Sequence, residues 1–252
     1  MRPPADRSTG STLGHVRSWL WTIPAAVFVT SVLITLGVIA LIVAPGDENQ
    51  RRIYTRWAGL VFKIIGARVT VLGLDDLDLT ANYVFAANHA SLMDIPAMFY
   101  SVPVPFKFLA KKELLKVPFI GWYIRRGGHL AVDRQSVRSS IASTNECARL
   151  MRERHLSVAI FPEGTRSPDG NLQPFRDGAA FLAIQAGVPV VPMAIVGMSD
   201  VLPARTSWFT PGDVQIRFGA PIPVEGLTTR QRADLTTRLE TAVRELSGRD
   251  AV

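Results

Sequence analysis

The chain lacks the cysteine pairs that could cross-link it. Its 252 residues include one cysteine, Cys147, so no internal disulfide can form. Cys147 falls in a helical pattern, where we expect it to be a small core residue. Charged residues are also sparse, at 19%, whereas 48% of the residues are hydrophobic. This balance favours association with a membrane, and the length allows one sizeable α/β domain with an appendage.

Charge is absent altogether from 18–46, and 19–44 is almost wholly apolar. About 20 apolar residues span a bilayer, so we predict a retained membrane anchor over 18–46. A secretory signal would have a shorter apolar run and a better cleavage site. Pro24 and Gly37 leave open a pair of short re-entrant helices, and arginines on both sides leave the orientation open. Residues 1–17 are polar and are predicted to be disordered.

Positive charge exceeds negative charge, with 28 Lys and Arg against 21 Asp and Glu. A net charge of +7 favours anionic partners, which include nucleic acid, anionic lipid and phosphorylated substrates. The basic residues are not interleaved with aromatic residues as in a single-strand platform, so we expect no nucleic-acid binding. Residues 50–66 form an amphipathic pattern that fits a helix packed on the domain or an interfacial helix on anionic lipid.

Short apolar runs alternate with helical patterns through 47–252. This order predicts an α/β fold with a mostly parallel sheet and helices on both faces, in addition to the N-terminal membrane-anchoring helical segment. Two prolines in 188–196 favour an irregular or edge strand there. The predicted strands are 68–72, 83–87, 106–110, 129–133, 157–161, 188–196 and 214–218, and the main predicted helices are 50–66, 95–100, 118–127, 136–154, 179–186 and 229–247.

The segment 88–94 joins a predicted strand to a predicted helix and contains His89 and Asp94. Five helical positions would put the two side chains about 140° apart, so they can meet only if His89 precedes the helix and its loop folds back. The carboxylate could then orient the imidazole as a general base. The alternatives are a helix cap at Asp94 and a histidine without a catalytic role. No third ligand has the spacing of a metal site, so we expect no metal.

A second candidate segment, 161–167, follows another predicted strand. Gly164 allows close approach of the backbone to a ligand, Thr165 offers donors, and Arg166 offers a planar cation for phosphate. The alternative is a β-turn in which Glu163 pairs with Arg166. Arg134 also follows a predicted strand, and the carboxyl ends of parallel strands share one edge of a sheet, where ligands gather.

Four blocks in a fixed order carry a resemblance to a known family. These blocks resemble the glycerolipid acyltransferases, whose best-known members are the 1-acylglycerol-3-phosphate acyltransferases. The segment 110–121 resembles the family's linker between its first two blocks, and the likeness covers about residues 50–225. The blocks are NHASLMD at 88–94, GGHLAVDR at 127–134, FPEGTRS at 161–167 and VPVVPMAI at 188–195.

The resemblance implies a role for each matched residue. His89 would be the general base and Asp94 its orienting partner, while Pro192 would have a structural or acyl-binding role. His129 and Ala131 depart from the family pattern, in which larger apolar residues are common, and this puts the local packing in doubt. The residues implied in binding the acceptor, with cations on its phosphate, are Lys111, Arg134, Glu163, Gly164, Thr165 and Arg166.

The expected function is transfer of a fatty acyl group from a thioester to the hydroxyl of a lysophospholipid. The foremost acceptor is 1-acylglycerol-3-phosphate, which would give phosphatidic acid. The co-substrate would be an acyl-coenzyme A or acyl carrier protein thioester, and no cofactor is expected. We expect the bilayer as a partner, a location at the cell membrane and a catalytic domain on the cytoplasmic face. The alternatives are another acceptor, or a non-catalytic membrane protein that binds anionic lipid.

Overall fold

The computed structural model describes residues 16–25, 27–28, 46–117, 120–133, 136–204, 206 and 208–248. Within these residues, seven strands form one sheet in the order β1-β7-β6-β2-β5-β3-β4. Every neighbouring pair is parallel except β6 and β7. The predicted mostly parallel α/β sheet is therefore confirmed. The strands are β1 (Ala67–Leu72), β2 (Val84–Ala87), β3 (Phe106–Lys111), β4 (Leu130–Val132), β5 (Ser157–Ile160), β6 (Val190–Val196) and β7 (Gly212–Phe218).

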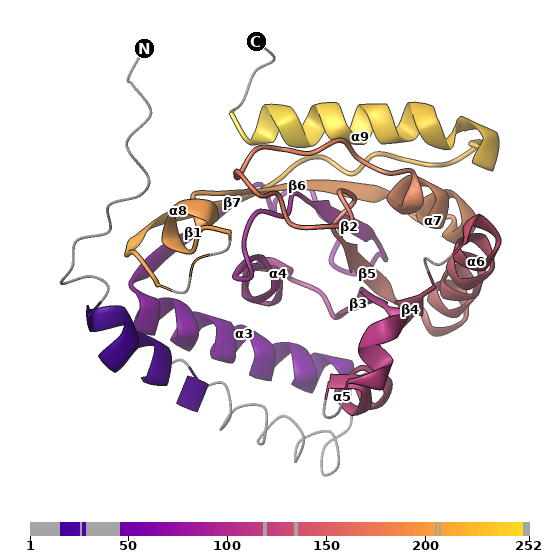
Figure 1. The fold of residues 1–252 in the computed structure, drawn as a ribbon. Helices are drawn as coiled ribbons and strands as arrows, with labels where there is room; N and C mark the ends of the chain where they lie inside the picture. Colours follow the sequence, from indigo (N-terminus) through magenta and orange to yellow (C-terminus); the bar gives the residue numbers. More distant parts are fainter. Residues whose placement is uncertain are drawn as a thin grey trace.

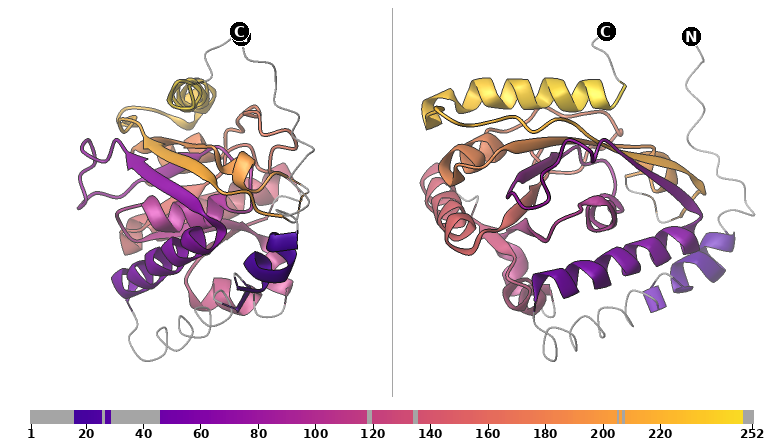
Figure 2. Two further views of the ribbon diagram at one scale, coloured as in Figure 1. Left: turned by 90° about the vertical axis from the view of Figure 1, so that its left-hand side faces the viewer. Right: turned by 180° about the vertical axis from the view of Figure 1, so that it is seen from behind.

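Helices cover both faces of this sheet, and Figures 1 and 2 show α3 along one side of the molecule and α9 along the other. Strand β2 supplies Phe85 and Ala87 to the core under α3 and α4, and Val84 and Ala86 to the core under α6, α7 and α9. Alternation along a strand thus serves two cores. The helices are α3 (Asp47–Ile65), α4 (Asp94–Ser101), α5 (Ile120–Arg126), α6 (Val137–Arg154), α7 (Gly178–Ala186), α8 (Met198–Val201) and α9 (Arg232–Leu246), with short helical turns at Lys112–Lys116 and Thr229–Gln231.

Helix α6 shows how local chemistry sets an element. Ser136 and Ser139 form a reciprocal capping box at its start. Thr144 and Met151 on the inner face of the helix are buried, and Cys147 is a buried core residue as expected. Ile141 is an exception, because 46% of it is exposed. It lies one turn from the helix start and lines a cavity of about 320 Å³ between α6 and the sheet.

Strand β6 corrects one prediction, since it lies inside the sheet between β2 and β7. Pro192 is tolerated there because of where its missing N–H would point. The carbonyl of Pro192 accepts a hydrogen bond from Gly219 N on the β7 side, and in a strand the N–H and C=O of one residue point the same way. The ladder with β7 begins only at Met193. The N–H that Pro192 lacks would therefore point towards β7 at a position outside that ladder. No hydrogen bond between β6 and β2 is lost.

The predicted anchor can be followed only in part, because residues 26 and 29–45 lie outside the described residues, as do residues 1–15 of the predicted disordered segment. Val16 and Arg17 are helical, although the sequence places them in that segment. The first helical turn, Ser18–Thr22, touches the domain through Ser18, whose hydroxyl donates to Phe209 O. Within the described part of the chain, no helix combines the length and apolar character needed to cross a bilayer.

An ion pair between a buried lysine and a partly exposed aspartate fastens the start of α3 to the sheet. Lys107 of β3 is only 6% exposed. Its Nζ donates to Asp47 Oδ1 and to Gly127 O, at 2.7 Å each. This contact fixes where the chain leaves the predicted anchor and enters the domain, because Asp47 is the first residue of α3.

We expect Asp47→Ala to lower the free energy of unfolding by about 1–2 kcal/mol, because a buried ammonium loses its charged partner and keeps only neutral ones. Chemical unfolding at low and high salt measures this loss. Asp75→Ala, in an exposed turn, is the control and should leave the free energy of unfolding within about 0.5 kcal/mol. Equal stability of the two variants would show that the pair contributes nothing.

Candidate active site

The histidine and aspartate of the first block meet at a strand-to-helix turn. Strand β2 ends at Ala87 and helix α4 begins at Asp94. The intervening loop folds back so that His89 Nδ1 lies 2.8 Å from Asp94 Oδ2. The sequence-based condition for contact, with His89 before the helix, is therefore met.

Asp94 is held more tightly than an ordinary helix cap. Its Oδ2 also accepts hydrogen bonds from the backbone N–H groups of Ala90 and Ser91, both at 2.7 Å, and its side chain is 1% exposed. Met93 occupies the position before the helix, so the simple cap interpretation of Asp94 is wrong. A carboxylate fixed in this way makes Nδ1 the donor and leaves Nε2 of His89 as an acceptor.

The imidazole ring of His89 rests on an aromatic face. Its centroid lies 4.0 Å from that of Phe161, and the two planes are 14° apart. The His89 side chain is 14% exposed, so the stacking partner covers one face while an edge stays accessible. Sequence reasoning did not assign Phe161 a role, although it opens the FPEGTRS block directly after β5.

Glu163 joins the two candidate loops through backbone atoms. Its Oε1 accepts the His89 N–H at 2.7 Å and its Oε2 accepts the Gln173 N–H at 3.2 Å. Ser167 N donates to His89 O at 2.8 Å, so the 161–167 loop binds both the backbone N–H and the backbone carbonyl of His89. Glu163 is 3% exposed. Its carboxylate is used by backbone donors and does not form the alternative pair with Arg166.

Burial raises the pKa of the Glu163 carboxyl to about 7, from an ordinary value of 4.5. The N–H donors of His89 and Gln173 act against this shift, whereas the nearby carboxylate of Asp94 adds to it. Two acidic groups therefore lie behind the imidazole. The hydrogen bonds to His89 and Gln173 require acceptor oxygens, so the protonation state of Glu163 bears directly on how the His89 turn is held.

Two further residues of the first block fix the turn to the domain. The Asn88 side chain donates to Ile195 O at 3.0 Å and accepts from Ile195 N at 2.7 Å, which locks it onto β6. Ser91 Oγ donates to Leu202 O and accepts from Met93 N. Ser91 is fully buried. Sequence reasoning missed Asn88, whose only signal was its place in the block.

A cavity of about 490 Å³ opens beside His89. Aromatic and aliphatic side chains form its walls, and two exposed cations, Lys111 and Arg166, stand in its lining. Of the predicted site residues, it brings together His89, Lys111, Gly164, Thr165 and Arg166, with Glu163 and Asp94 behind them. Arg134 lies outside the described residues. The remaining lining residues are Ile95, Phe99, Phe108, Leu109, Ala110, Leu114, Ile124, His129 and Phe161.

His129, which departs from the family pattern, lies in the wall of this cavity. Its Nδ1 accepts the backbone N–H of Phe108 at 3.1 Å. Burial and the nearby Lys107 cation lower its pKa to about 4, so the ring is neutral at pH 7 and packs as a small aromatic group. The hydrogen bond from Phe108 therefore accommodates His129 at a position where the family pattern has a larger apolar residue. Across the described residues, no three His, Cys, Asp or Glu side chains gather where they could hold a metal ion.

Comparisons with known proteins decide the family. The acyltransferase family model matches residues 68–196, which include His89, Asp94 and the 161–167 loop. This chain belongs to the acyltransferase family. The resemblance to the glycerolipid acyltransferases is thereby confirmed, and the expected class, O-acyltransferase, is that of its relatives.

Individual relatives agree with this assignment. Human 1-acyl-sn-glycerol-3-phosphate acyltransferase alpha is 34% identical over 73% of this chain and 66% of its own length. The 1-acyl-sn-glycerol-3-phosphate acyltransferase of Limnanthes douglasii is 31% identical over 81% of this chain and 73% of its own. The crystal structure of the 1-acyl-sn-glycerophosphate (LPA) acyltransferase PlsC from Thermotoga maritima is 27% identical, with a TM-score of 0.74 over 94% of this chain and 99% of that one.

The raised pKa of Glu163 makes the stability of this acyltransferase depend on pH. Because the folded-state pKa lies above the ordinary value, the folded state holds its proton more firmly between pH 4.5 and 7. Stability derived from this group is full below about pH 4.5 and is lost as pH rises towards 7. We therefore expect the free energy of unfolding of the native chain, minus that of Glu163→Gln, to fall over this range and to level off above pH 7.

Denaturant titrations of both proteins at half-unit steps from pH 4.5 to 8.5 measure this difference. Subtracting the variant cancels every other titrating group that the substitution leaves unchanged. A difference that stays constant across the series would contradict the buried, proton-binding role of Glu163.

Proposed function

We propose that this acyltransferase moves an acyl group from a thioester to the free hydroxyl of 1-acylglycerol-3-phosphate. One observation carries the proposal: the imidazole oriented by Asp94 lies in the wall of a cavity that also holds Lys111 and Arg166. A base and two cations in one apolar hollow match an acceptor that has a hydroxyl, a phosphate and an acyl chain. The relatives named above act on this acceptor according to their names.

The proposed reaction is direct acyl transfer. The acceptor phosphate binds Arg166 and Lys111, which places its hydroxyl against Nε2 of His89. As the oxygen attacks the thioester carbonyl, its proton passes to Nε2 and the imidazolium is stabilised by Asp94. When the tetrahedral intermediate collapses, the C–S bond breaks and the thiolate takes the proton from His89. One ester forms, one thioester is consumed and the imidazole returns to its neutral form.

Two side chains that could form an acyl-enzyme are already engaged. Ser91 Oγ is buried and bound to Leu202 O. Cys147 lies on the buried face of α6, where burial raises the pKa of its thiol to about 12. Neither could supply a nucleophile at neutral pH, which supports direct transfer without a covalent intermediate.

We further propose that the bilayer delivers the acceptor. Exposed apolar side chains lie on the N-terminal helical turns, and others lie at the mouth of the cavity. A lipid surface would cover both groups. The predicted anchor at 18–46 would hold this surface at the membrane, with the domain on the cytoplasmic face, where thioester donors are made. These side chains are Trp19, Leu20, Trp21, Val27 and Phe28 near the N-terminus, and Ile95 and Leu114 near the mouth.

We expect His89→Ala to lower kcat by about 10²–10⁴-fold, the range of general-base catalysis. Asp94→Asn should also lower kcat, because the amide cannot stabilise an imidazolium as a carboxylate does. The assay follows transfer from a labelled acyl thioester to 1-acylglycerol-3-phosphate in detergent micelles. Vesicle binding should be unchanged in both variants.

The matched control is His155→Asn, which replaces an exposed histidine at the end of α6 and should keep full activity. Native turnover by His89→Ala would refute the mechanism. Native binding combined with no turnover in the unmodified chain would instead favour the alternative of a lipid-binding protein.

The phosphate assignment makes a separate prediction. Arg166→Ala and Lys111→Ala should each raise KM for 1-acylglycerol-3-phosphate by about ten- to hundredfold, since a charge-assisted hydrogen bond contributes about 1.5–3 kcal/mol. Monoacylglycerol, which has no phosphate, should be used equally poorly by all forms. Lys116→Ala, at an exposed position outside the cavity, is the control. A preference for monoacylglycerol or for a lyso-aminolipid would assign the site to a different acceptor.

A further inference from the structure

Helix α9 carries a row of polar side chains beside its buried apolar stripe. Residues four positions apart lie on the same side of a helix, so the row runs along the helix axis. Packing of Leu235, Leu239 and Val243 into the core fixes the direction in which the row faces. The members of the row are Arg232, Thr236, Glu240 and Arg244.

Glu240 of this row holds the segment between the 161–167 loop and α7. Its Oε2 accepts the backbone N–H of Phe175 at 2.9 Å. Phe175 is 9% exposed, so water has little access to this N–H in place of the carboxylate. The other oxygen, Oε1, accepts a hydrogen bond from Arg244 at 3.0 Å. The two oxygens of Glu240 therefore have separate partners, one on the segment and one on α9 itself.

Two other members of the row contact the end of the same segment. Thr236 Oγ1 donates to Asp177 Oδ1 at 3.1 Å, and Arg232 Nε lies 3.3 Å from Asp177 Oδ2. Nearly half of each side chain of this ion pair is exposed, so the pair contributes little. Glu240 is thus the member of the row whose partner on the segment is a buried backbone donor.

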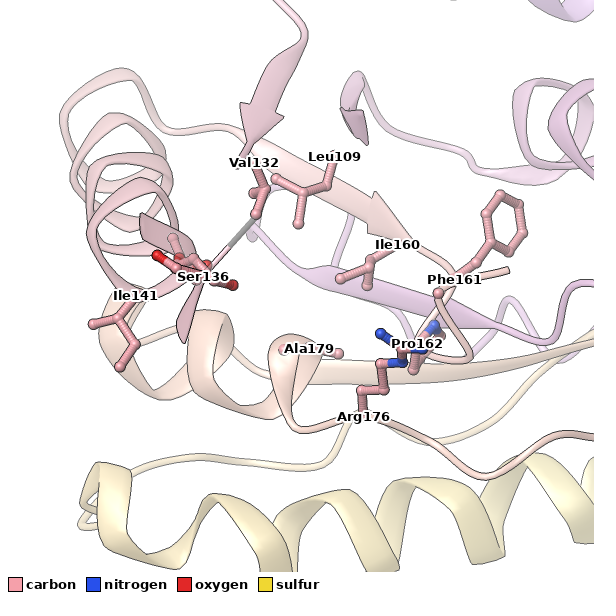
Figure 3. A pocket seen from close by; sticks show the side chains of 13 residues that line it. Leu109, Val132, Ser136, Ile141, Ile160, Phe161, Pro162, Arg176 and Ala179 are labelled. Carbon is pink, nitrogen blue, oxygen red and sulfur yellow. The ribbon is translucent and has the colours of Figure 1, made fainter. Parts of the chain in front are cut away.

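The residues on either side of Phe175 reach the active site. Arg176 N donates to Pro162 O at 3.0 Å. Figure 3 shows these two side chains next to each other, with helix α9 running past them in pale yellow. On the other side, Gln173 N donates to Glu163 Oε2 at 3.2 Å. The segment that Glu240 holds therefore lies against the first residues of the FPEGTRS block.

From Glu163 the connection continues to the imidazole. The second oxygen of its carboxyl, Oε1, accepts the His89 N–H at 2.7 Å. Electrostatics also place Glu240 near this carboxyl, because burial raises the pKa of Glu163 and the negative charges of Asp94 and Glu240 add to the rise. A path of three hydrogen bonds thus runs from α9 to the backbone of His89.

We propose that Glu240 is a positioning residue for His89, so that helix α9 takes part in the reaction although it lies beyond the residues 68–196 that the family model matches. This inference rests on the proposed function, in which His89 is the base. Without Glu240 the N–H of Phe175 has no acceptor, and the segment is free to move away from Glu163. The turn that carries the imidazole then loses part of its support. A displacement of about 1 Å at a reacting group can cost a factor of about 10² in rate.

The test compares Glu240→Ala with Glu240→Gln in the full chain. Both variants lose the carboxylate that pairs with Arg244, but only glutamine keeps an oxygen that can accept the Phe175 N–H. We expect kcat to fall about tenfold in Glu240→Ala and to stay within about threefold of native in Glu240→Gln. KM for 1-acylglycerol-3-phosphate should stay within about threefold in both, because the cations of the acceptor site are unchanged.

The matched control is Glu245→Ala, which removes an exposed glutamate from the same helix and should keep native kcat. If Glu240→Ala unfolds at the assay temperature, Glu240→Leu takes its place, since leucine fills a similar space and has no acceptor oxygen.

Hydrogen exchange of backbone amides gives a readout that needs no turnover. In Glu240→Ala the amides of Phe175, Gln173 and His89 should exchange about tenfold faster than in the native chain. The amides of the central strand β6 should keep their native rates, which distinguishes a local release from a general loss of stability. Glu240→Gln and Glu245→Ala should exchange like the native chain at all of these positions.

Three results would overturn the role of Glu240. These are equal losses of kcat in the alanine and glutamine variants, native kcat in the alanine variant, and faster exchange at Phe175 with native exchange at His89. If exchange at His89 rises as expected but His89→Ala keeps native turnover, the path from α9 stands and the proposed base is wrong.

Discussion

The hydrogen bond from the His89 N–H to Glu163 is the contact on which the site depends. It joins two loops whose residues are 74 positions apart, and the return bond from Ser167 to the His89 carbonyl closes the link. Without it, the imidazole that Asp94 orients would have no fixed relation to the loop that carries Arg166. Glu163 can do this only because it is buried, where a hydrogen bond meets little competition from water.

The sheet supplies the frame that makes this contact possible. Strands β2, β5 and β3 are parallel neighbours, so the loops that follow them emerge at one edge. All four residues of β2 and of β5 are buried, because helices cover both faces. Rigid, fully covered strands hold the ends of the two loops still, and the loops remain free to carry polar groups that a core could not accept.

Covering both faces also creates two hollows, one on each side of the same edge. Their walls meet at Leu109, Phe161 and Gly164. Gly164 has a positive φ of 78°, and the Arg176 side chain packs against it, with its Nε 3.2 Å from where a Cβ would lie.

The sequence by itself determined the parallel α/β class, most element positions, the His89–Asp94 pair and the family, because these follow from local periodicity and from residues close together in the chain. The tertiary structure alone decided that Glu163 binds backbone rather than Arg166, that Phe161 supports the imidazole, and that β6 lies inside the sheet despite Pro192. Each of these depends on which atoms of a distant segment face a given group. Spacing along one chain carries no information about that until the sheet has brought the segments together.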